Sequence, residues 1–311
     1  MGAGCEMDEE KKEVVIIGAG PAGLTAGIYL AQNKIDITIL ERGLPGGRMG
    51  EAVEIDNYPG FPEGVTGKEL TERMVSQLER FGVKIRFPEE VLKFSFTESG
   101  KEVFTRKARY LAKAVIIATG GESMKLNIAG EERLLGRGVS YCAVCDGFFF
   151  REKTVCVIGR GEEAGQDALY LSNLADEVYL LMYGKEEMSG STFDKLKDRE
   201  NIHMLEGTPL EILGKEKVEG VKIERDGKTK VLRVDGVFIG LGMTPSTRIA
   251  KEAGIKVNER REIIVDKRQM TNIEGVFAAG DCTGGFKQIV IAAGEGATAA
   301  LYAIRYLRRR L

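Results

Sequence analysis

Near its N-terminus the chain reads Val14-Val15-Ile16-Ile17-Gly18-Ala19-Gly20-Pro21-Ala22-Gly23. Four consecutive apolar residues are typical of a parallel β-strand that is covered on both faces. The glycines that follow have the spacing Gly-x-Gly-x-x-Gly, and the next residues, to about Asn33, predict a helix. A second strand is expected over residues 35–40. This strand, turn, helix and strand together predict the start of a Rossmann-like nucleotide-binding fold.

Each glycine of the turn has its own task. Gly18 permits the sharp turn from strand to helix, Gly20 lets the backbone approach a pyrophosphate, and Gly23 allows close packing of helix on strand. The helix that begins near Ala22 directs its free N–H groups and positive dipole end toward the phosphates. Glu41 lies eighteen residues beyond Gly23, at the end of the second strand, where a carboxylate can hold ribose hydroxyls. The turn therefore predicts a dinucleotide site.

A related pattern restarts in the middle of the chain. Residues 154–158 predict a strand, the turn Gly159-Arg160-Gly161 follows, and residues 164–173 have the character of a helix. An apolar run then ends in Gly280-Asp281, which either caps a turn or, in a flavoprotein, binds a ribityl hydroxyl. A long C-terminal helix is expected over residues 289–307.

The two patterns predict an α/β protein of two Rossmann-like, three-layer ββα nucleotide-binding domains, the second inserted into the first. Residues 83–112 are expected to form an antiparallel meander and residues 114–118 a separate buried strand. The expected first domain comprises residues 12–121 and 246–311, and the second comprises residues 122–245, with residues 1 to about 12 as a frayed lead-in.

Composition narrows the class of protein. The chain has 311 residues, of which 43% are hydrophobic and 30% charged, which is ordinary for a globular protein. A net charge of −2 with no basic patch argues against a nucleic-acid partner. No apolar run approaches the roughly 18–20 residues that span a bilayer. Five cysteines are too few for a secreted disulfide scaffold. We therefore expect a cytoplasmic protein without a membrane segment.

The second distinctive stretch is Cys142-Ala143-Val144-Cys145-Asp146-Gly147. Two thiols three residues apart at a helix start can close a disulfide, and the helix terminus favours a reactive thiolate. Asp146 can pass protons to a leaving thiolate, or simply cap the helix. Half of a zinc site is the alternative interpretation of the cysteine pair. The chain has one histidine, His203, and no second CxxC, so we expect no metal.

In combination these motifs resemble the low-molecular-weight thioredoxin reductases over nearly the whole chain. The match rests on residues 18–23, Gly46-Gly47, residues 54–60, Ala118-Thr119-Gly120, residues 142–147, and Gly280-Asp281 with Lys287-Gln288. The resemblance implies an FAD-dependent thioredoxin-disulfide reductase. Its partner would be a thioredoxin-like or glutaredoxin-like protein, and two copies of the chain would form a homodimer.

The resemblance also assigns roles to residues. Asn57 and Gln288 would lie near the isoalloxazine ring and Asp281 on the ribityl chain. Cys145 would face the flavin, whereas Cys142 would attack the partner disulfide. The inserted domain would rotate on hinges at Gly120-Gly121 and residues 242–245. The residues expected to bind FAD are Gly18, Gly20, Pro21, Ala22, Gly23, Glu41, Gly46, Gly47, Asn57, Ala118, Thr119, Gly120, Gly280, Asp281, Lys287, Gln288 and Ile289.

The chain departs from the family at the electron-donor site. Members that use NADPH carry a basic His-Arg-Arg cluster and a further arginine, where this sequence has Met182-Tyr183-Gly184 and Met188. Since a charge-assisted hydrogen bond contributes about 1.5–3 kcal/mol, losing two weakens NADPH binding by roughly 10²–10⁴-fold. In the glycine turn, Arg160 replaces a glycine and Glu162-Glu163 bring negative charge to the phosphate position.

The donor-site candidates are Gly159, Arg160, Gly161 and Tyr183. The pattern resembles divergent archaeal thioredoxin reductases, of which some take electrons from a reduced deazaflavin coenzyme. We therefore expect a reduced deazaflavin rather than NADPH, with NADPH or NADH as the alternative donor. Two other functions stay open. One is the flavoprotein reductase of a peroxidase system, although such enzymes carry a thioredoxin-like extension that this sequence does not contain. The other is a non-catalytic flavin redox sensor.

Overall fold

The computed structural model describes residues 8–52, 55–97, 100–184 and 187–309. Glu54, part of one motif used above, lies outside these residues. The chain divides into two compact units. The first holds the described residues up to Glu122 and those from Pro245 onward, and the second is Ser123–Thr244. Among the described residues, no helix is long and apolar enough to cross a membrane.

The first unit is built on a seven-stranded sheet with the order β3-β2-β1-β6-β5-β4, in which β17 also pairs with β6. Its strands are β1 (Asp8–Ile17), β2 (Ile37–Leu40), β3 (Ile85–Arg86), β4 (Val91–Thr97), β5 (Gly100–Thr105), β6 (Ala108–Ile117) and β17 (Val276–Ala278). Its helices are α1 (Pro21–Gln32), α2 (Arg48–Glu51), α3 (Gly67–Glu79), α7 (Arg248–Glu252), α8 (Ile289–Arg308) and the 3₁₀ turn η2 (Asp281–Thr283).

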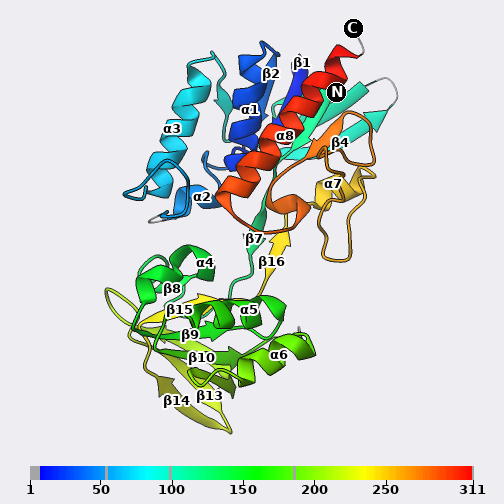
Figure 1. Ribbon diagram of the computed structural model, residues 1–311. Coiled ribbons are helices and arrows are strands. Elements are labelled where there is room, and N and C mark those ends of the chain that lie inside the picture. The colour runs from blue at the N-terminus through cyan, green and yellow to red at the C-terminus, as the bar shows by residue number, and fades with distance from the viewer. Residues whose placement is uncertain (1–7, 53–54, 98–99, 185–186, 310–311) are drawn as a thin grey trace, which may run out of the picture. The chain divides into compact units, whose positions relative to one another are not determined.

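Alternate residues of β1 serve two cores. Val14 and Ile16 pack with α1, α3 and α8, which lie side by side in Figure 1. Val15 and Ile17 pack on the opposite face with apolar residues of β4 and β5. Both faces of the strand are therefore covered, as its uninterrupted apolar run predicted.

Two boundary predictions in this unit were wrong. β1 begins at Asp8, because residues 8–12 pair in parallel with residues 108–112 of β6. The charged side chains of this segment make cross-strand ion pairs, such as Glu9 with Arg109, instead of burying apolar surface. The predicted antiparallel meander is present as β4, β5 and β6, but its last strand, β6, continues without a break into the segment expected to be a separate strand. Residues 1–7 lie outside the described residues.

The second unit has a five-stranded sheet of order β11-β10-β9-β15-β8 and a three-stranded sheet of order β12-β13-β14. Its strands are β8 (Val139–Ser140), β9 (Thr154–Ile158), β10 (Glu177–Met182), β11 (Ile202–Glu206), β12 (Thr208–Leu213), β13 (Gly220–Arg225), β14 (Lys228–Leu232) and β15 (Gly236–Ile239). Its helices are α4 (Ala143–Asp146), the 3₁₀ turn η1 (Gly147–Phe150), α5 (Glu162–Leu171) and α6 (Gly190–Lys197).

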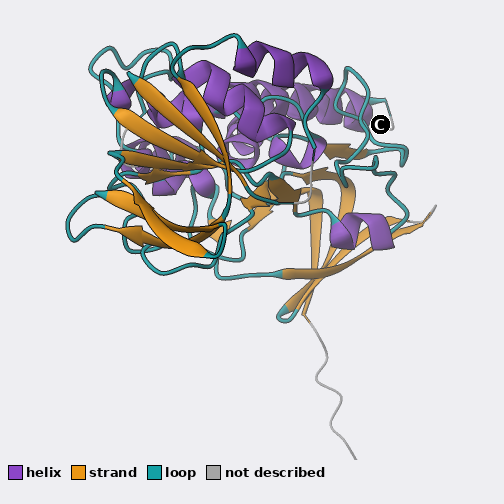
Figure 2. Ribbon diagram, turned by 90° about the horizontal axis from the view of Figure 1, so that it is seen from below, coloured by secondary structure: helices purple, strands orange, loops and turns teal. Residues whose placement is uncertain are grey.

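This unit has three layers. One face of the five-stranded sheet packs on α5 and α6, and the opposite face packs on β12 and β13 (Figures 1 and 2). The α/β class and the Rossmann-like ββα layering expected from the sequence are confirmed. The two connections between the units, β7 (Gly121–Ser123) and β16 (Met243–Pro245), pair as a two-stranded sheet.

Candidate functional site

The residues predicted to bind FAD gather at one edge of the seven-stranded sheet. Since β1, β2, β6 and β17 run parallel, their carboxyl ends meet there. Gly18 follows β1, Glu41 follows β2, Ala118-Thr119-Gly120 follow β6, and Gly280-Asp281 follow β17. Backbone hydrogen bonds between neighbouring turns fix this arrangement. Ligands of open α/β sheets bind at this edge, so the placement supports the predicted FAD site.

The glycine turn is tightly packed at two positions and open at the third. A Cβ atom at Gly18 would lie 2.2 Å from the Ala118 carbonyl oxygen, and one at Gly23 would lie 1.9 Å from the Gly18 carbonyl oxygen. A Cβ atom at Gly20 would meet only the Gly46 carbonyl oxygen, at 4.0 Å. The protein's own packing therefore does not require a glycine at position 20. The open space lies at the N-terminus of α1, where a phosphate can reach backbone N–H groups, so the turn fits a pyrophosphate.

Glu41 organises the loop after β2. One carboxylate oxygen accepts a hydrogen bond from the Ala19 N–H and the other from the Gly43 N–H, each at 2.8 Å. Gly46-Gly47 are held beside the turn because the Gly46 N–H donates to the Ala19 carbonyl at 2.8 Å. Glu41 also lines a cavity of about 120 Å³ together with residues at the ends of β1 and β6. Its position suits the predicted contact with a ribose.

The two residues expected near the isoalloxazine ring contact each other. Asn57 Nδ2 donates to Gln288 Oε1 at 3.1 Å, although 231 residues separate them. Gln288 immediately precedes α8, and Ile289, the first residue of α8, packs against the core of this unit. The structure therefore brings this predicted pair together beside the first turn of α8.

Asp281 lies beside two cations. Burial raises the pKa of its carboxyl group, and the positive charges of Arg48 and Lys287 oppose that rise. Arg48 Nη1 lies 3.4 Å from Asp281 Oδ2. Neither Arg48 nor Glu295, whose Oε2 accepts from the Gly280 N–H at 2.7 Å, was predicted from the sequence. The sequence signal for Glu295 was its position in the expected C-terminal helix, seven residues after Gln288.

Gly20 gives a clean test of the FAD site. We expect Gly20→Ala to fold normally, because its Cβ atom meets nothing closer than 4.0 Å. Bound FAD would be displaced, since the methyl group occupies the phosphate approach. Losing a charge-assisted hydrogen bond corresponds to roughly 10–100-fold weaker FAD binding, measured by fluorescence titration of the apoprotein. Gly190→Ala in α6, where a Cβ atom also meets nothing within 4 Å, is the matched control. Unchanged FAD affinity in Gly20→Ala would contradict the site.

Cys142 and Cys145 form a disulfide, with their Cα atoms 5.3 Å apart. Cys142 is the N-cap of α4, and its Sγ accepts a hydrogen bond from the Cys145 N–H at 3.2 Å. That N–H would also stabilise a thiolate on Cys142 after reduction. The other cysteines of the described residues, Cys156 and Cys282, are buried and free.

Asp146 is the last residue of α4. Burial raises the pKa of its carboxyl group, and a hydrogen bond with Ser140 opposes the rise. A carboxyl group with a raised pKa keeps its proton closer to neutral pH, which suits the predicted transfer of a proton to a leaving thiolate. The structure thus places the acid on the same helical turn as the disulfide.

The second glycine turn lies between β9 and α5. A Cβ atom at Gly159 would lie 2.3 Å from the Gly240 carbonyl oxygen, so packing alone requires this glycine. Arg160 Nη2 lies 3.5 Å from Glu206 Oε1 at the end of β11. Gly161 is the N-cap of α5 and provides no side chain to cap the helix.

Glu162 links this turn to α6 by hydrogen bonds. Its Oε1 accepts from the Thr192 hydroxyl at 2.5 Å, and its Oε2 accepts from the Ser189 N–H at 2.9 Å. Gln166 Nε2 adds a third hydrogen bond, at 3.0 Å. The hydrogen bonds from Thr192 and Ser189 are the largest causes that lower the pKa of Glu162, which falls to about 2. The carboxylate is therefore ionised at neutral pH. A fixed negative charge therefore lies in the first turn of α5.

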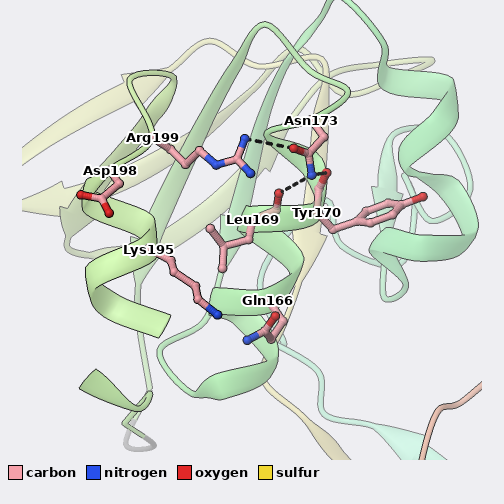
Figure 3. A pocket seen from close by; sticks show the side chains of 7 residues that line it. All are labelled: Gln166, Leu169, Tyr170, Asn173, Lys195, Asp198 and Arg199. Carbon is pink, nitrogen blue, oxygen red and sulfur yellow. Dashed lines mark hydrogen bonds between the residues drawn. The ribbon is translucent and has the colours of Figure 1, made fainter. Parts of the chain in front are cut away.

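Of the three positions where NADPH-dependent members carry arginine, Tyr183 and Met188 are partly buried and Gly184 is exposed. Tyr183 packs against the core between the two sheets of this unit. Met188 packs against the core beneath α5, and its Sδ lies 3.4 Å from where a Gly165 Cβ atom would be. A surface hollow between α5 and α6 is lined by Gln166, Leu169, Tyr170, Asn173, Lys195, Asp198 and Arg199 (Figure 3). None of these seven residues was predicted for the donor site.

The chain combines two Rossmann-like units, one with a glycine turn fitted to a pyrophosphate and one with a redox-type disulfide. This combination is typical of a class of flavoprotein reductases. A family model described as pyridine nucleotide-disulphide oxidoreductase matches residues 12–296, and the chain belongs to this family.

Within the family, the chain is similar to thioredoxin reductases. The thioredoxin reductase of Listeria innocua is 39% identical over 312 residues, covering 96% of this chain and 95% of the relative. That of Bacillus subtilis is 38% identical over 307 residues, covering 94% of each. The crystal structure of the thioredoxin reductase from Streptococcus pyogenes is 37% identical, with a TM-score of 0.91, and covers 96% of this chain and 99% of that one. The resemblance and the enzyme class stated from the sequence are confirmed.

Proposed function

We propose that the protein is an FAD-dependent thioredoxin-disulfide reductase. It passes two electrons from a reduced donor, through FAD and the Cys142–Cys145 disulfide, to a thioredoxin-like or glutaredoxin-like protein. The observation that carries the proposal is the disulfide at the start of α4, in a chain that also holds a turn fitted to a pyrophosphate. The thioredoxin reductases among its relatives supply the substrate class.

The first unit would hold FAD at its sheet edge. The Gly18–Gly23 turn would take the pyrophosphate, Glu41 a ribose, Asp281 the ribityl chain, and the Asn57–Gln288 pair the ring. Bound FAD supplies a carrier for two electrons between the donor and the disulfide.

The second unit performs the thiol exchange. In the reduced enzyme, the Cys142 thiolate attacks a sulfur of the partner disulfide, which forms a mixed disulfide and releases one partner thiolate. Asp146 would protonate that thiolate. The Cys145 thiolate then attacks Cys142 Sγ, which releases the second partner thiolate and restores the Cys142–Cys145 disulfide. The partner disulfide gains two electrons and the enzyme dithiol loses two.

We propose that the donor is a reduced deazaflavin coenzyme rather than NADPH. The support is the ionised Glu162 at the start of α5 and the packed side chains of Tyr183 and Met188 at two of the three positions where arginines would hold a 2′-phosphate. Arg160 is engaged with Glu206. NADPH or NADH is the competing donor, and direct reduction experiments distinguish them.

We further propose a homodimer and a hinge. Val290, Ile291 and Leu301 of α8 are exposed apolar side chains that a second copy could cover, which sedimentation analysis would test. The paired connections β7 and β16, flanked by Gly120 and Gly242 with positive φ, would serve as the hinge of the inserted unit. The free buried thiols fit a reducing cytoplasm.

Dithionite titration tests whether the disulfide and the flavin are coupled. We expect the holoenzyme to take up about four electrons per chain, two for the flavin and two for the disulfide. Cys142→Ser cannot form the disulfide and should take up about two. Uptake of two electrons by both proteins would refute the proposed function. Turnover with a purified oxidised thioredoxin would then distinguish a reductase from a redox sensor. Transfer of electrons from the protein to a peroxidase would favour the peroxidase-system alternative.

A further inference from the structure

A small cavity lies at the carboxyl ends of β1, β2 and β6, next to Glu41. Its volume is about 120 Å³, well below the roughly 300–1,000 Å³ of pockets that hold a whole drug-sized ligand. The buried side chains of Leu40, Phe94 and Ile117 contribute apolar surface to its lining. The cavity therefore suits one ring system of a larger ligand rather than the whole ligand.

The charged residues of the lining are mostly acidic. They are Glu41, Glu89 and Glu90, together with Arg42, whose guanidinium is already paired with the carboxylate of Glu122. An excess of carboxylates repels a phosphate and favours a neutral group that donates hydrogen bonds. The charge and the apolar surface together point to a neutral ring with a donor at its edge.

Glu89 is the buried acid of this lining, with only 6% of its surface exposed. Its N–H donates to the Glu41 carbonyl oxygen at 2.7 Å, so it lies beside the residue predicted to hold a ribose. Its Oε1 accepts from the Tyr110 phenol at 2.7 Å and from the Thr105 hydroxyl at 2.9 Å. Burial, followed by the hydrogen bond to Glu89, raises the pKa of Tyr110, so the phenol keeps its proton and remains the donor.

The second oxygen of Glu89 is left without a donor. Both side-chain hydrogen bonds end on Oε1, and no group among the described residues donates to Oε2. A carboxylate oxygen can only accept, and burying an acceptor without a donor costs free energy. A ligand that brings a hydrogen-bond donor into the cavity would remove this cost.

We propose that Glu89 determines which base the cavity accepts, with Oε2 accepting a hydrogen bond from the exocyclic amino group of adenine. This assignment rests on the proposed function, in which Glu41 holds a ribose of FAD, because the base on that ribose would enter the neighbouring cavity. Guanine and hypoxanthine carry a carbonyl oxygen where adenine carries its amino group. They would place an acceptor against an acceptor, so the cavity selects the adenine dinucleotide.

The test compares two dinucleotides on the full-length chain after removal of its flavin. One is FAD, and the other is flavin purine dinucleotide, in which a hydrogen atom replaces the amino group of the base. Flavin fluorescence measures both dissociation constants. We expect the wild type to bind FAD about 10–100-fold more tightly than the analogue, the effect of one hydrogen bond to a charged group.

Glu89→Gln should remove this preference. Its amide oxygen would keep the hydrogen bonds from Tyr110 and Thr105, which leaves the amide N–H groups at the position of Oε2. A donor would then face the amino group of FAD, so the affinity for FAD should fall. The ratio of the two dissociation constants should drop to about twofold or less.

Glu79→Gln is the matched control, because it makes the same change at an exposed position at the end of α3 in the same unit. It should keep the wild-type preference. A merely structural role of Glu89 would weaken both dinucleotides equally, so an unchanged preference in Glu89→Gln would overturn the proposal. Equal binding of the two dinucleotides by the wild type would also overturn it while leaving the proposed function intact. Failure of the wild type to bind either dinucleotide would instead refute the proposed function, and the role of Glu89 with it.

Discussion

Cys142→Ser is expected to lose at least about 10³-fold in turnover with a thioredoxin-like substrate while keeping its bound FAD. A serine hydroxyl is not ionised near neutral pH and cannot attack a disulfide or form one, so neither exchange step can occur. The glycine turn and the sheet edge that fit FAD belong to the other unit of the chain and are untouched. Steady-state reduction of oxidised thioredoxin measures the loss, and the flavin absorbance of the purified variant measures retention.

Cys145→Ser separates the roles of the two sulfurs. It should also lose turnover, but its Cys142 can still attack the partner and should accumulate as a mixed disulfide that is visible by mass spectrometry. Cys156→Ala is the matched control, because Cys156 is a free, fully buried thiol in β9 of the same unit. It should keep turnover within about twofold. Trapping of the partner by Cys142→Ser instead of Cys145→Ser would reverse the assignment of the attacking thiol.

The local patterns of this sequence predicted most of the fold. The run from Val14 to Gly23 forms a buried strand, a turn and a helix because each of these depends on neighbours in the chain. The first half of β1 was not predictable in this way. Its residues are charged, and they form a strand only because β6 pairs with them and supplies Arg109 as a counter-ion for Glu9.

The residues of the candidate site also differ in how far the sequence alone could predict their roles. The CxxC pair could be read from the sequence because its chemistry depends on two residues three apart. The role of Glu162 could be read only in part, since its charge is visible in the sequence but its bonds to Ser189 and Thr192 are made on a different helix.

The donor can be identified by anaerobic stopped-flow measurement of flavin bleaching. We expect rapid, saturable bleaching by a reduced deazaflavin coenzyme. NADPH should bind roughly 10²–10⁴-fold more weakly than it would to a protein with two charge-assisted contacts to the 2′-phosphate. NADH lacks the 2′-phosphate and therefore does not need the arginines, but it still meets the ionised Glu162. Fast, saturable bleaching by micromolar NADPH would refute the donor proposal and leave the disulfide chemistry standing.

Glu162→Gln tests the physical reason for that preference. The amide keeps the shape of the side chain and an oxygen that can accept from Thr192 or the Ser189 N–H, but it removes the negative charge beside the expected phosphate position. Two like charges about 4 Å apart near a protein surface repel by up to ~4 kcal/mol, and partial screening should leave about a tenfold gain in affinity for NADPH and NADH.

Glu200→Gln is the control, because it removes an equal charge from an exposed position in the same unit. It should change the affinity for neither nucleotide. Since a deazaflavin coenzyme need not place a pyrophosphate on this turn, its bleaching rate should be the same in both variants and the wild type. An unchanged affinity for both nucleotides in Glu162→Gln would mean that the packed side chains Tyr183 and Met188, rather than the charge, exclude them.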